Sequence, residues 1–156
     1  MTKFKTKILK STHTCSFEKI IEYLKTRIES KDKDGDGTVN VKLTPNKITR
    51  TIYKKLQINE IEALFLGFRY CTFVYDIKYD DKTIICVTKN PHLMKKIFKY
   101  TDNIIIEKNI DGTITLTREI KSKQKNIISS LISYSVEEKY ILMSNEEFMY
   151  IFNQCK

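Results

Sequence analysis

Apolar residues recur at helical spacing near each end of the chain. Ser16 can cap a helix whose apolar residues follow at intervals of three and four, on one stripe: Phe17, Ile20, Ile21, Leu24 and Ile28. At the other end, Ser144 and Glu147 have the spacing of a capping box, and the stripe continues through Phe148, Ile151, Phe152 and Cys155. These patterns predict amphipathic helices over residues 16–28 and 144–155.

Two Xaa-Pro pairs, Thr44-Pro45 and Asn90-Pro91, have the sequence of a capped helix start with proline in the first turn. The helix expected over residues 45–56 carries Ile48 and Ile52 on its apolar stripe and Arg50 on another face. The second proline predicts a helix over residues 91–100. Shorter helices are expected over residues 59–66, where Asn59 and Glu62 resemble a capping box, and around residues 124–132.

Alternation of apolar and polar residues predicts strands between these helices. Residues 38–43 alternate strictly, as in a half-buried strand. Residues 68–77 and 82–88 form a predicted hairpin, and a turn at Asp80-Asp81 would place Tyr75 opposite Cys86. A further short strand is expected over residues 139–143.

A second hairpin turns at Asp111-Gly112, and two registers are compatible with its sequence. A strict two-residue turn would place Glu107 opposite Leu116. A three-residue loop, with Gly112 in the left-handed region, places Ile106 opposite Leu116 and Ile104 opposite Arg118. The second register gathers the isoleucines on one face and is therefore preferred.

Taken together, the elements predict an α+β fold in a single domain spanning residues 1–156. The expected architecture is a mainly antiparallel sheet of about five or six strands, with helices packed largely on one face. A chain of 156 residues is long enough to bury roughly two-thirds of the surface that it exposes when unfolded.

The composition is strongly biased. The chain has 24 lysines against 4 arginines, and 23 isoleucines against one alanine. Codons rich in A and T explain this bias, so the expected source is an AT-rich virus, plasmid or similar genome. The formal net charge of +9 favours a polyanionic partner, such as nucleic acid, an anionic membrane or an acidic protein surface, over a merely solvated surface.

The spacing of the cysteines and the hydropathy of the chain indicate the cellular compartment in which the protein is expected. The four cysteines lie far apart with no Cys-x-x-Cys pair, which indicates neither a zinc site nor a disulfide framework. No segment is apolar over the roughly 18 residues of a membrane span, and residues 1–10 lack the hydrophobic region of a signal peptide. An intracellular protein in a reducing cytoplasm is expected, with no cofactor.

The segment Asp32-x-Asp34-x-Asp36-Gly37 resembles the first half of a helix–loop–helix calcium loop. The position that should supply a bidentate glutamate is Leu43. Without that ligand the affinity for calcium would be poor, so the segment is interpreted as a solvated turn and no metal site is predicted.

Asp102, Glu119 and Lys121 have the residue types of a Mg²⁺-dependent nuclease site, and the preferred hairpin register brings their strand ends together. An acidic residue two positions before a lysine occurs five times in the chain, however, where composition alone predicts about three. The chain also lacks a phosphate-binding glycine loop and a nucleophile elbow, so a non-enzymatic protein is expected.

Basic residues interleaved with aromatic residues give the remaining functional pattern. Lysines attract the phosphate backbone, and tyrosine rings stack on unpaired bases, a combination typical of single-strand binders. The predicted nucleic-acid-binding residues are Arg69, Tyr70, Tyr75, Lys78, Tyr79, Lys95, Lys96, Lys99, Lys121, Lys123 and Lys125.

The sequence therefore favours an accessory protein that binds single-stranded DNA or RNA through its backbone. Two alternatives stay open. The first is a protein-interaction factor, an inhibitor or subunit that docks onto a host or viral complex; the second is the Mg²⁺-dependent nuclease. The pattern of residues does not fix the oligomeric state.

Overall fold

The computed structural model describes residues 5–26, 38–45, 47–55, 58–66, 69–89, 98–124, 142 and 145–156. The elements are β1 (Lys5–His13), α1 (Phe17–Lys25), β2 (Thr38–Thr44), β3 (Lys47–Lys55), α2 (Glu60–Leu66), β4 (Tyr70–Tyr79), β5 (Thr83–Lys89), β6 (Phe98–Lys108) and β7 (Ile114–Gln124). Residues 145–154 form a further helix, called here the C-terminal helix.

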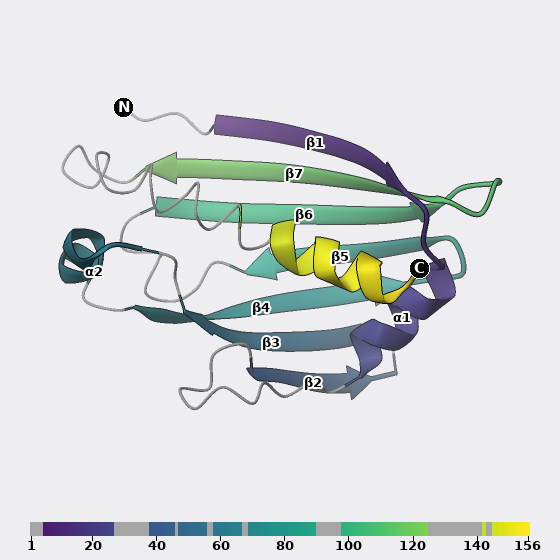
Figure 1. Ribbon diagram of the computed structural model, residues 1–156, viewed down its shortest axis with the longest axis horizontal. Helices are drawn as coiled ribbons and strands as arrows, with labels where there is room; N and C mark the ends of the chain where they lie inside the picture. The colour runs from purple at the N-terminus through teal and green to yellow at the C-terminus, as the bar shows by residue number, and fades with distance from the viewer. Residues whose placement is uncertain are drawn as a thin grey trace.

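The seven strands form one antiparallel sheet in the order β1-β7-β6-β5-β4-β3-β2 (Figure 1). The first strand therefore pairs with the last, and every other neighbouring pair is consecutive in the chain. The α+β prediction is confirmed, but the expected five or six strands were too few.

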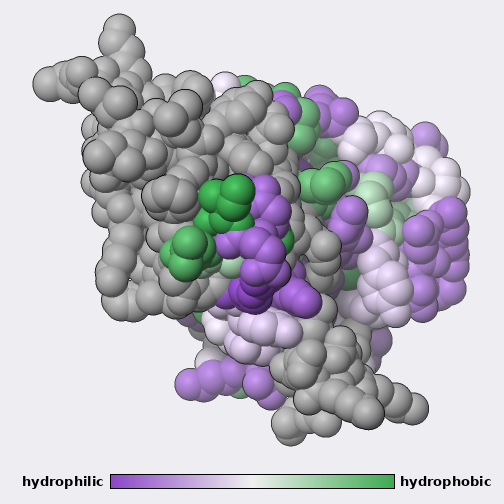
Figure 2. All heavy atoms as spheres, turned by 60° about the vertical axis from the view of Figure 1, so that its left-hand side comes forward, coloured by the Kyte–Doolittle hydropathy of each residue, from purple (hydrophilic) through white to green (hydrophobic). Residues whose placement is uncertain are grey.

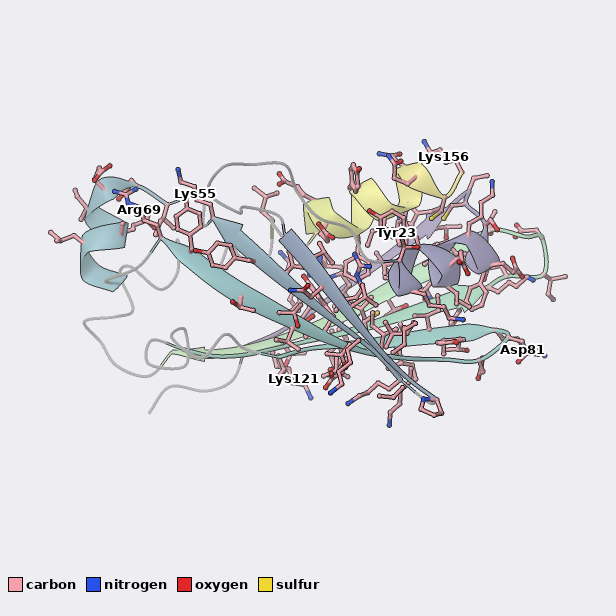
Figure 3. The ribbon with its side chains drawn as sticks, turned by 90° about the horizontal axis from the view of Figure 1, so that it is seen from below. Tyr23, Lys55, Arg69, Asp81, Lys121 and Lys156 are labelled. Carbon is pink, nitrogen blue, oxygen red and sulfur yellow. The ribbon has the colours of Figure 1, made fainter. Side chains whose placement is uncertain are left out.

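Two helices lie on one side of the sheet, while α2 lies beyond one end of it (Figures 1 and 3). The side covered by α1 and the C-terminal helix is called here the inner face, and the opposite side the outer face. The core forms where these helices meet the inner face. Its main buried members are Phe17, Ile20 and Leu24 of α1, Phe148, Ile151 and Phe152 of the C-terminal helix, and Ile48, Ile77, Ile84, Cys86, Ile104 and Leu116 of the strands.

The ends of the two helices are fixed to one another. Ser16 caps α1, since its Oγ accepts a hydrogen bond from the backbone nitrogen of Lys19 at 3.3 Å. The backbone nitrogen of Ser16 donates to the carbonyl oxygen of Cys155 at 2.8 Å. The start of α1 and the end of the C-terminal helix are thereby joined. Both predicted helices are observed, but α1 ends at Lys25, with Thr26 in an extended conformation as its C-cap, short of the predicted end at residue 28.

Two local predictions are confirmed in detail. In the β6–β7 hairpin, Ile106 pairs with Leu116 and Ile104 with Arg118, and Gly112 has a φ of 87°. This left-handed conformation is one that glycine adopts without strain, so the three-residue loop is the observed one. At the start of α2, Asn59 and Glu62 exchange two hydrogen bonds of 2.8 and 3.1 Å, as in a capping box.

Other predictions are wrong. Residues 47–55 form strand β3 and not a helix. The β4–β5 turn is Asp81-Lys82 and not Asp80-Asp81, since the backbone nitrogen of Asp80 donates to the carbonyl oxygen of Thr83 at 2.9 Å; Tyr75 therefore pairs with Thr88, and Cys86 pairs with Ile77. Residues 98–100 begin β6 rather than end a helix, and β1 was not predicted at all. Leu142, the one described residue of the expected strand 139–143, is helical.

Some predictions lie outside the described residues. These are the acidic segment with Asp32, Asp34 and Asp36, most of the helix expected over residues 91–100, and the helix expected after Gln124.

His13 gives the fold a pH dependence. Its ring packs on Phe152, with 4.8 Å between centroids, and its Nε2 lies 2.7 Å from Ser11 Oγ. Burial lowers the pKa of His13 from its usual value. A lowered folded-state pKa stabilises the fold above the unfolded pKa, and this contribution is lost as the pH falls through the folded-state value.

We therefore expect the free energy of unfolding to decrease as the pH falls below about 6.5, and part of this decrease to vanish in His13→Gln. Urea denaturation of both proteins at about pH 5 and about pH 8 measures the difference. An identical decrease in the two proteins would show that His13 does not contribute.

Candidate functional site

Four buried polar side chains form a row across the middle of the inner face. Strand pairing places Arg50 of β3 opposite Tyr75 of β4, Tyr75 opposite Thr88 of β5, and Thr88 opposite Asp102 of β6. Their exposed fractions are 1%, 4%, 1% and 0%. The neighbouring row is apolar, with Ile48, Ile77, Cys86 and Ile104. Burying polar groups in this way is costly unless each group has a partner.

Arg50 reaches from the sheet to the end of α1. Its Nη1 lies 3.3, 3.1 and 3.2 Å from the carbonyl oxygens of Tyr23, Leu24 and Thr26. These carbonyls lie at the negative end of the helix dipole, where the Tyr23 oxygen also accepts from the backbone nitrogen of Thr26, so the guanidinium caps α1. The guanidinium carbon also lies 5.5 Å from the centroid of the Tyr23 ring, at cation–π distance.

The other end of the row is a closed ion pair. Arg118 of β7 contacts both carboxylate oxygens of Asp102, through Nη2 and, at 3.4 Å, through Nε. Its Nη1 donates to Oδ1 of Asn145 on the C-terminal helix at 3.3 Å. The pair thus ties β6 and β7 to the C-terminal helix.

Two atoms of the row have no hydrogen-bond partner among the described residues: Arg50 Nη2 and Thr88 Oγ1. Arg50 also lines a cavity of about 10 Å³ between α1, β3, β4 and the C-terminal helix. The lining residues are Leu24, Arg50, Ile52, Tyr75, Ile77, Glu147, Phe148 and Ile151. Such a volume has room for about one water molecule.

The electrostatics of the cavity follow from burial and from Glu147. Burial lowers the pKa of Arg50, and the carboxylate of Glu147 opposes this change. Burial, followed by the charge of Glu147, raises the pKa of Tyr23 to about 12. Tyr23 is therefore neutral at physiological pH, whereas an arginine side chain stays protonated in proteins.

The predicted nucleic-acid-binding residues do not share one surface. Tyr75 is buried on the inner face, with its ring edge against Phe148 at 6.0 Å, and is not accessible to a base. Alternation along β4 and β7 places Lys78 and Lys121 on the outer face, and Figure 3 shows Lys121 on the side away from the helices. Lys121 lies 3.0 Å from Glu119.

The remaining described members lie at the two ends of the sheet. Arg69 forms an ion pair with Glu60 of α2 at 2.6 Å, and Tyr70 stacks on Tyr53 at 5.3 Å (Figure 3). Tyr79 lies at the opposite end of β4, and the centroid of its ring is 4.9 Å from the Nζ of Lys25. Lys99 and Lys123 are paired positions of β6 and β7, whereas Lys95, Lys96 and Lys125 lie outside the described residues.

The end of the molecule that carries Arg69 is not uniformly basic. Figure 2 shows apolar side chains at the surface there, and Ile61 and Leu64 of α2 are 66% and 82% exposed. A continuous positively charged surface is what binding to a phosphate backbone requires.

The predicted nuclease residues are also separated. Asp102 pairs with Ile120, so alternation places Asp102 on the inner face and Glu119 and Lys121 on the outer face. The register was predicted correctly, but the three side chains do not converge. Asp102 is instead held by Arg118.

The sequence matches no protein-family model and no curated protein. Among solved structures, SA2116, a protein of unknown function from Staphylococcus aureus, has a TM-score of 0.55 at 6% identity, covering 98% of this chain and 96% of that chain. A START superfamily protein from Mycobacterium smegmatis has a TM-score of 0.46 at 10% identity, with 97% of both chains covered. Major latex-like protein 151 from Panax ginseng has a TM-score of 0.41 at 9% identity, covering 88% of this chain and 95% of that chain.

The likeness to SA2116 shows a shared fold.

None of the helices in the described part of the chain has the length and apolar character to cross a bilayer. The prediction of a single-strand nucleic-acid-binding protein is wrong: among the described residues, the predicted side chains are spread over both faces and both ends of the sheet, and Tyr75 is buried. The described residues likewise give no support to a docking factor or a nuclease.

Proposed function

We propose that this chain is a non-enzymatic binding protein for a hydrophobic small molecule, held between the inner face of the sheet and the two helices. The observation that carries the proposal is Arg50, a buried arginine with one nitrogen unpartnered among the described residues, at the wall of a mostly apolar cavity.

The cavity wall has the composition of a ligand site. Five of its eight residues are apolar, and the three polar ones, Arg50, Tyr75 and Glu147, come from β3, β4 and the C-terminal helix. Sites for small molecules combine an apolar lining with a few polar groups that converge from different elements. Nη1 of Arg50 caps α1, but this structural role does not account for Nη2, which is buried without a partner among the described residues at a cost in free energy.

A ligand larger than one water requires the cavity to widen. The strands are fixed to one another by continuous ladders, whereas the C-terminal helix is held by side-chain contacts, by hydrogen bonds that include Arg118–Asn145 and Ser16–Cys155, and by apolar packing. Side-chain packing is lost more readily than a strand ladder, so the C-terminal helix is the element expected to move.

The chemistry of the described residues favours binding over catalysis. Burial raises the pKa of Cys15 to about 11 and that of Cys86 to about 12, so both thiols are protonated at neutral pH. The Ser11–His13 contact lies on edge strand β1, and no carboxylate among the described residues hydrogen-bonds His13. An activated nucleophile needs an oriented base or a thiolate.

The test uses the isoleucine content of the chain. Titration of ¹³C-methyl-labelled protein with 1-octanol and with octanoate is expected to shift the methyl signals of Ile52, Ile77 and Ile151, which line the cavity. Ile8, Ile85 and Ile110 are exposed and serve as internal controls, since a specific site leaves them unchanged. Equal shifts in both sets, or none, would contradict the proposed function.

A further inference from the structure

We infer that Cys15 and Cys155 are a site of covalent modification, at which the two thiols oxidise to a disulfide. Both residues are free thiols in the structure. The disulfide would join the residue before the cap of α1 to the end of the C-terminal helix. The inference goes beyond the proposed function and does not depend on a ligand, because it concerns the contact between the two helices and not the cavity.

A backbone hydrogen bond brings the two cysteines together. The nitrogen of Ser16 donates to the carbonyl oxygen of Cys155 at 2.8 Å, where the end of the C-terminal helix meets the start of α1 (Figure 1). In a trans peptide, the Cα atom of Cys15 lies on the same side as this N–H group. Standard bond lengths then put the two Cα atoms within about 6 Å of each other. Disulfides usually join Cα atoms that are about 4.4–6.8 Å apart, so the backbone already has the required separation.

The two side chains are buried in the same part of the core. Cys15 is 5% exposed and Cys155 is 1% exposed, and both belong to one cluster of buried residues. Burial, followed by the charge of Cys155, raises the pKa of the Cys15 thiol to about 11. One thiolate can affect the other in this way only if the two sulfur atoms are close.

Contacts on both sides of the pair hold the junction of the two helices in place. The ring of His13 packs on Phe152, with 4.8 Å between centroids. The Nζ of Lys19 donates to the carbonyl oxygen of Lys156 at 3.3 Å. Two thiols that are held side by side react with one another far more readily than with a thiol of another molecule, because no entropy is lost in bringing them together.

The reaction is a thiol–disulfide exchange with glutathione disulfide as the oxidant. The thiolate of one cysteine attacks a sulfur atom of the oxidant, forms a mixed disulfide and releases one glutathione thiolate. The thiolate of the other cysteine then attacks the protein sulfur of the mixed disulfide and releases a second glutathione thiolate. The protein thereby loses two electrons and two protons, and the oxidant is reduced to two molecules of glutathione.

Oxidation is expected to stabilise the fold. The two cysteines lie near opposite ends of the described chain, so a bond between them closes a long loop and restricts the unfolded state strongly. The large separation along the sequence is also the reason why the spacing of the cysteines did not reveal the pair.

The test compares the protein after equilibration with reduced and with oxidised glutathione at about pH 8.5, where thiolates are more abundant than at neutral pH. Peptide mapping by mass spectrometry is expected to find a Cys15–Cys155 cross-link in monomers of the oxidised protein. The midpoint of thermal unfolding should rise by roughly 5–15 °C on oxidation. Cys155→Ala should abolish both the cross-link and this rise.

Cys86→Ala is the matched control, since it removes another buried thiol and leaves the pair intact. This variant should keep the cross-link and the rise on oxidation. Each variant is compared with its own reduced form, so the cost of the substitution itself cancels. Absence of the cross-link from the folded, oxidised protein, a disulfide between two copies of the chain, or an equal rise in Cys155→Ala would each overturn the inference. If Cys155→Ala does not fold, the peptide map of the unsubstituted protein still decides.

The outcome is separate from that of the ligand titration. Failure of 1-octanol and octanoate to bind would contradict the proposed function and leave the cysteine pair untouched. Failure of the cross-link to form would leave the proposed function untouched.

Discussion

Truncation after Met143 is expected to abolish cooperative unfolding. The deletion removes Phe148, Ile151 and Phe152, each at most 3% exposed in the core of the fold. Burial of a large apolar side chain contributes about 1.5–3 kcal/mol. The three together are comparable with the whole stability of a domain, about 5–15 kcal/mol, so the shortened chain should lose its folded state. Thermal denaturation followed by circular dichroism measures this effect.

Tyr150→Ala provides the control on the same helix. Tyr150 is 55% exposed, so its replacement should change the free energy of unfolding by less than about 0.5 kcal/mol. A truncated chain that unfolds cooperatively at the melting temperature of the full chain would show that the C-terminal helix is not part of the core.

Asp102→Ala should be the most damaging single substitution of a polar residue on the inner face. It leaves Arg118 buried without its carboxylate, and breaking a buried ion pair from one side costs about 3–5 kcal/mol. Joint replacement by Asp102→Leu and Arg118→Met should recover much of this loss, because no unpaired charge is left. The free energy of unfolding in urea gives both values.

Glu119→Ala is the matched control for this prediction. Glu119 lies on the same sheet but on the outer face, and its ion pair with Lys121 is partly exposed. Such surface pairs contribute about 0–1 kcal/mol. If Asp102→Ala costs no more than Glu119→Ala, the buried pair does not contribute to the stability as its geometry implies.

The error at β3 shows why the fold could be predicted only in part. Ile48 and Ile52 are four residues apart, and this spacing puts two side chains on one face of a helix and also on one face of a strand. Thr44-Pro45 favoured the helix, but the strand formed because β2 and β4 pair with β3 on both sides. Tertiary pairing overrode the local signal.

The same error concealed Arg50. In a helix, Arg50 would face away from Ile48 and Ile52, whereas in a strand all three face the same way. A lysine- and isoleucine-rich chain offers many exposed basic residues, so an arginine between two isoleucines carried no special signal. The burial of Arg50 can be inferred only once residues 47–55 are known to form a strand.

The polar row could not be predicted from the sequence for a further reason. The positions of Asp102 and Arg118 follow from a hairpin whose register was predicted correctly, because the loop with Gly112 fixes that register locally. Thr88 and Tyr75 required the β4–β5 register, which was predicted two residues away from the observed one. The row depends on the β3–β4, β4–β5 and β5–β6 registers together. An error in any one of them places its four residues in different rows.

The position of β1 at the edge of the sheet has a consequence during synthesis on the ribosome. Its one partner strand is β7, which begins about 100 residues later in the chain. At a synthesis rate of roughly 5–20 residues per second, β1 therefore stays unpaired for some 5–20 s. An unpaired strand is a template for aggregation, and charged lysines suppress this association. Lys7 and Lys10 are spaced along β1, so we expect these lysines to oppose aggregation of the nascent chain until β7 has been synthesised.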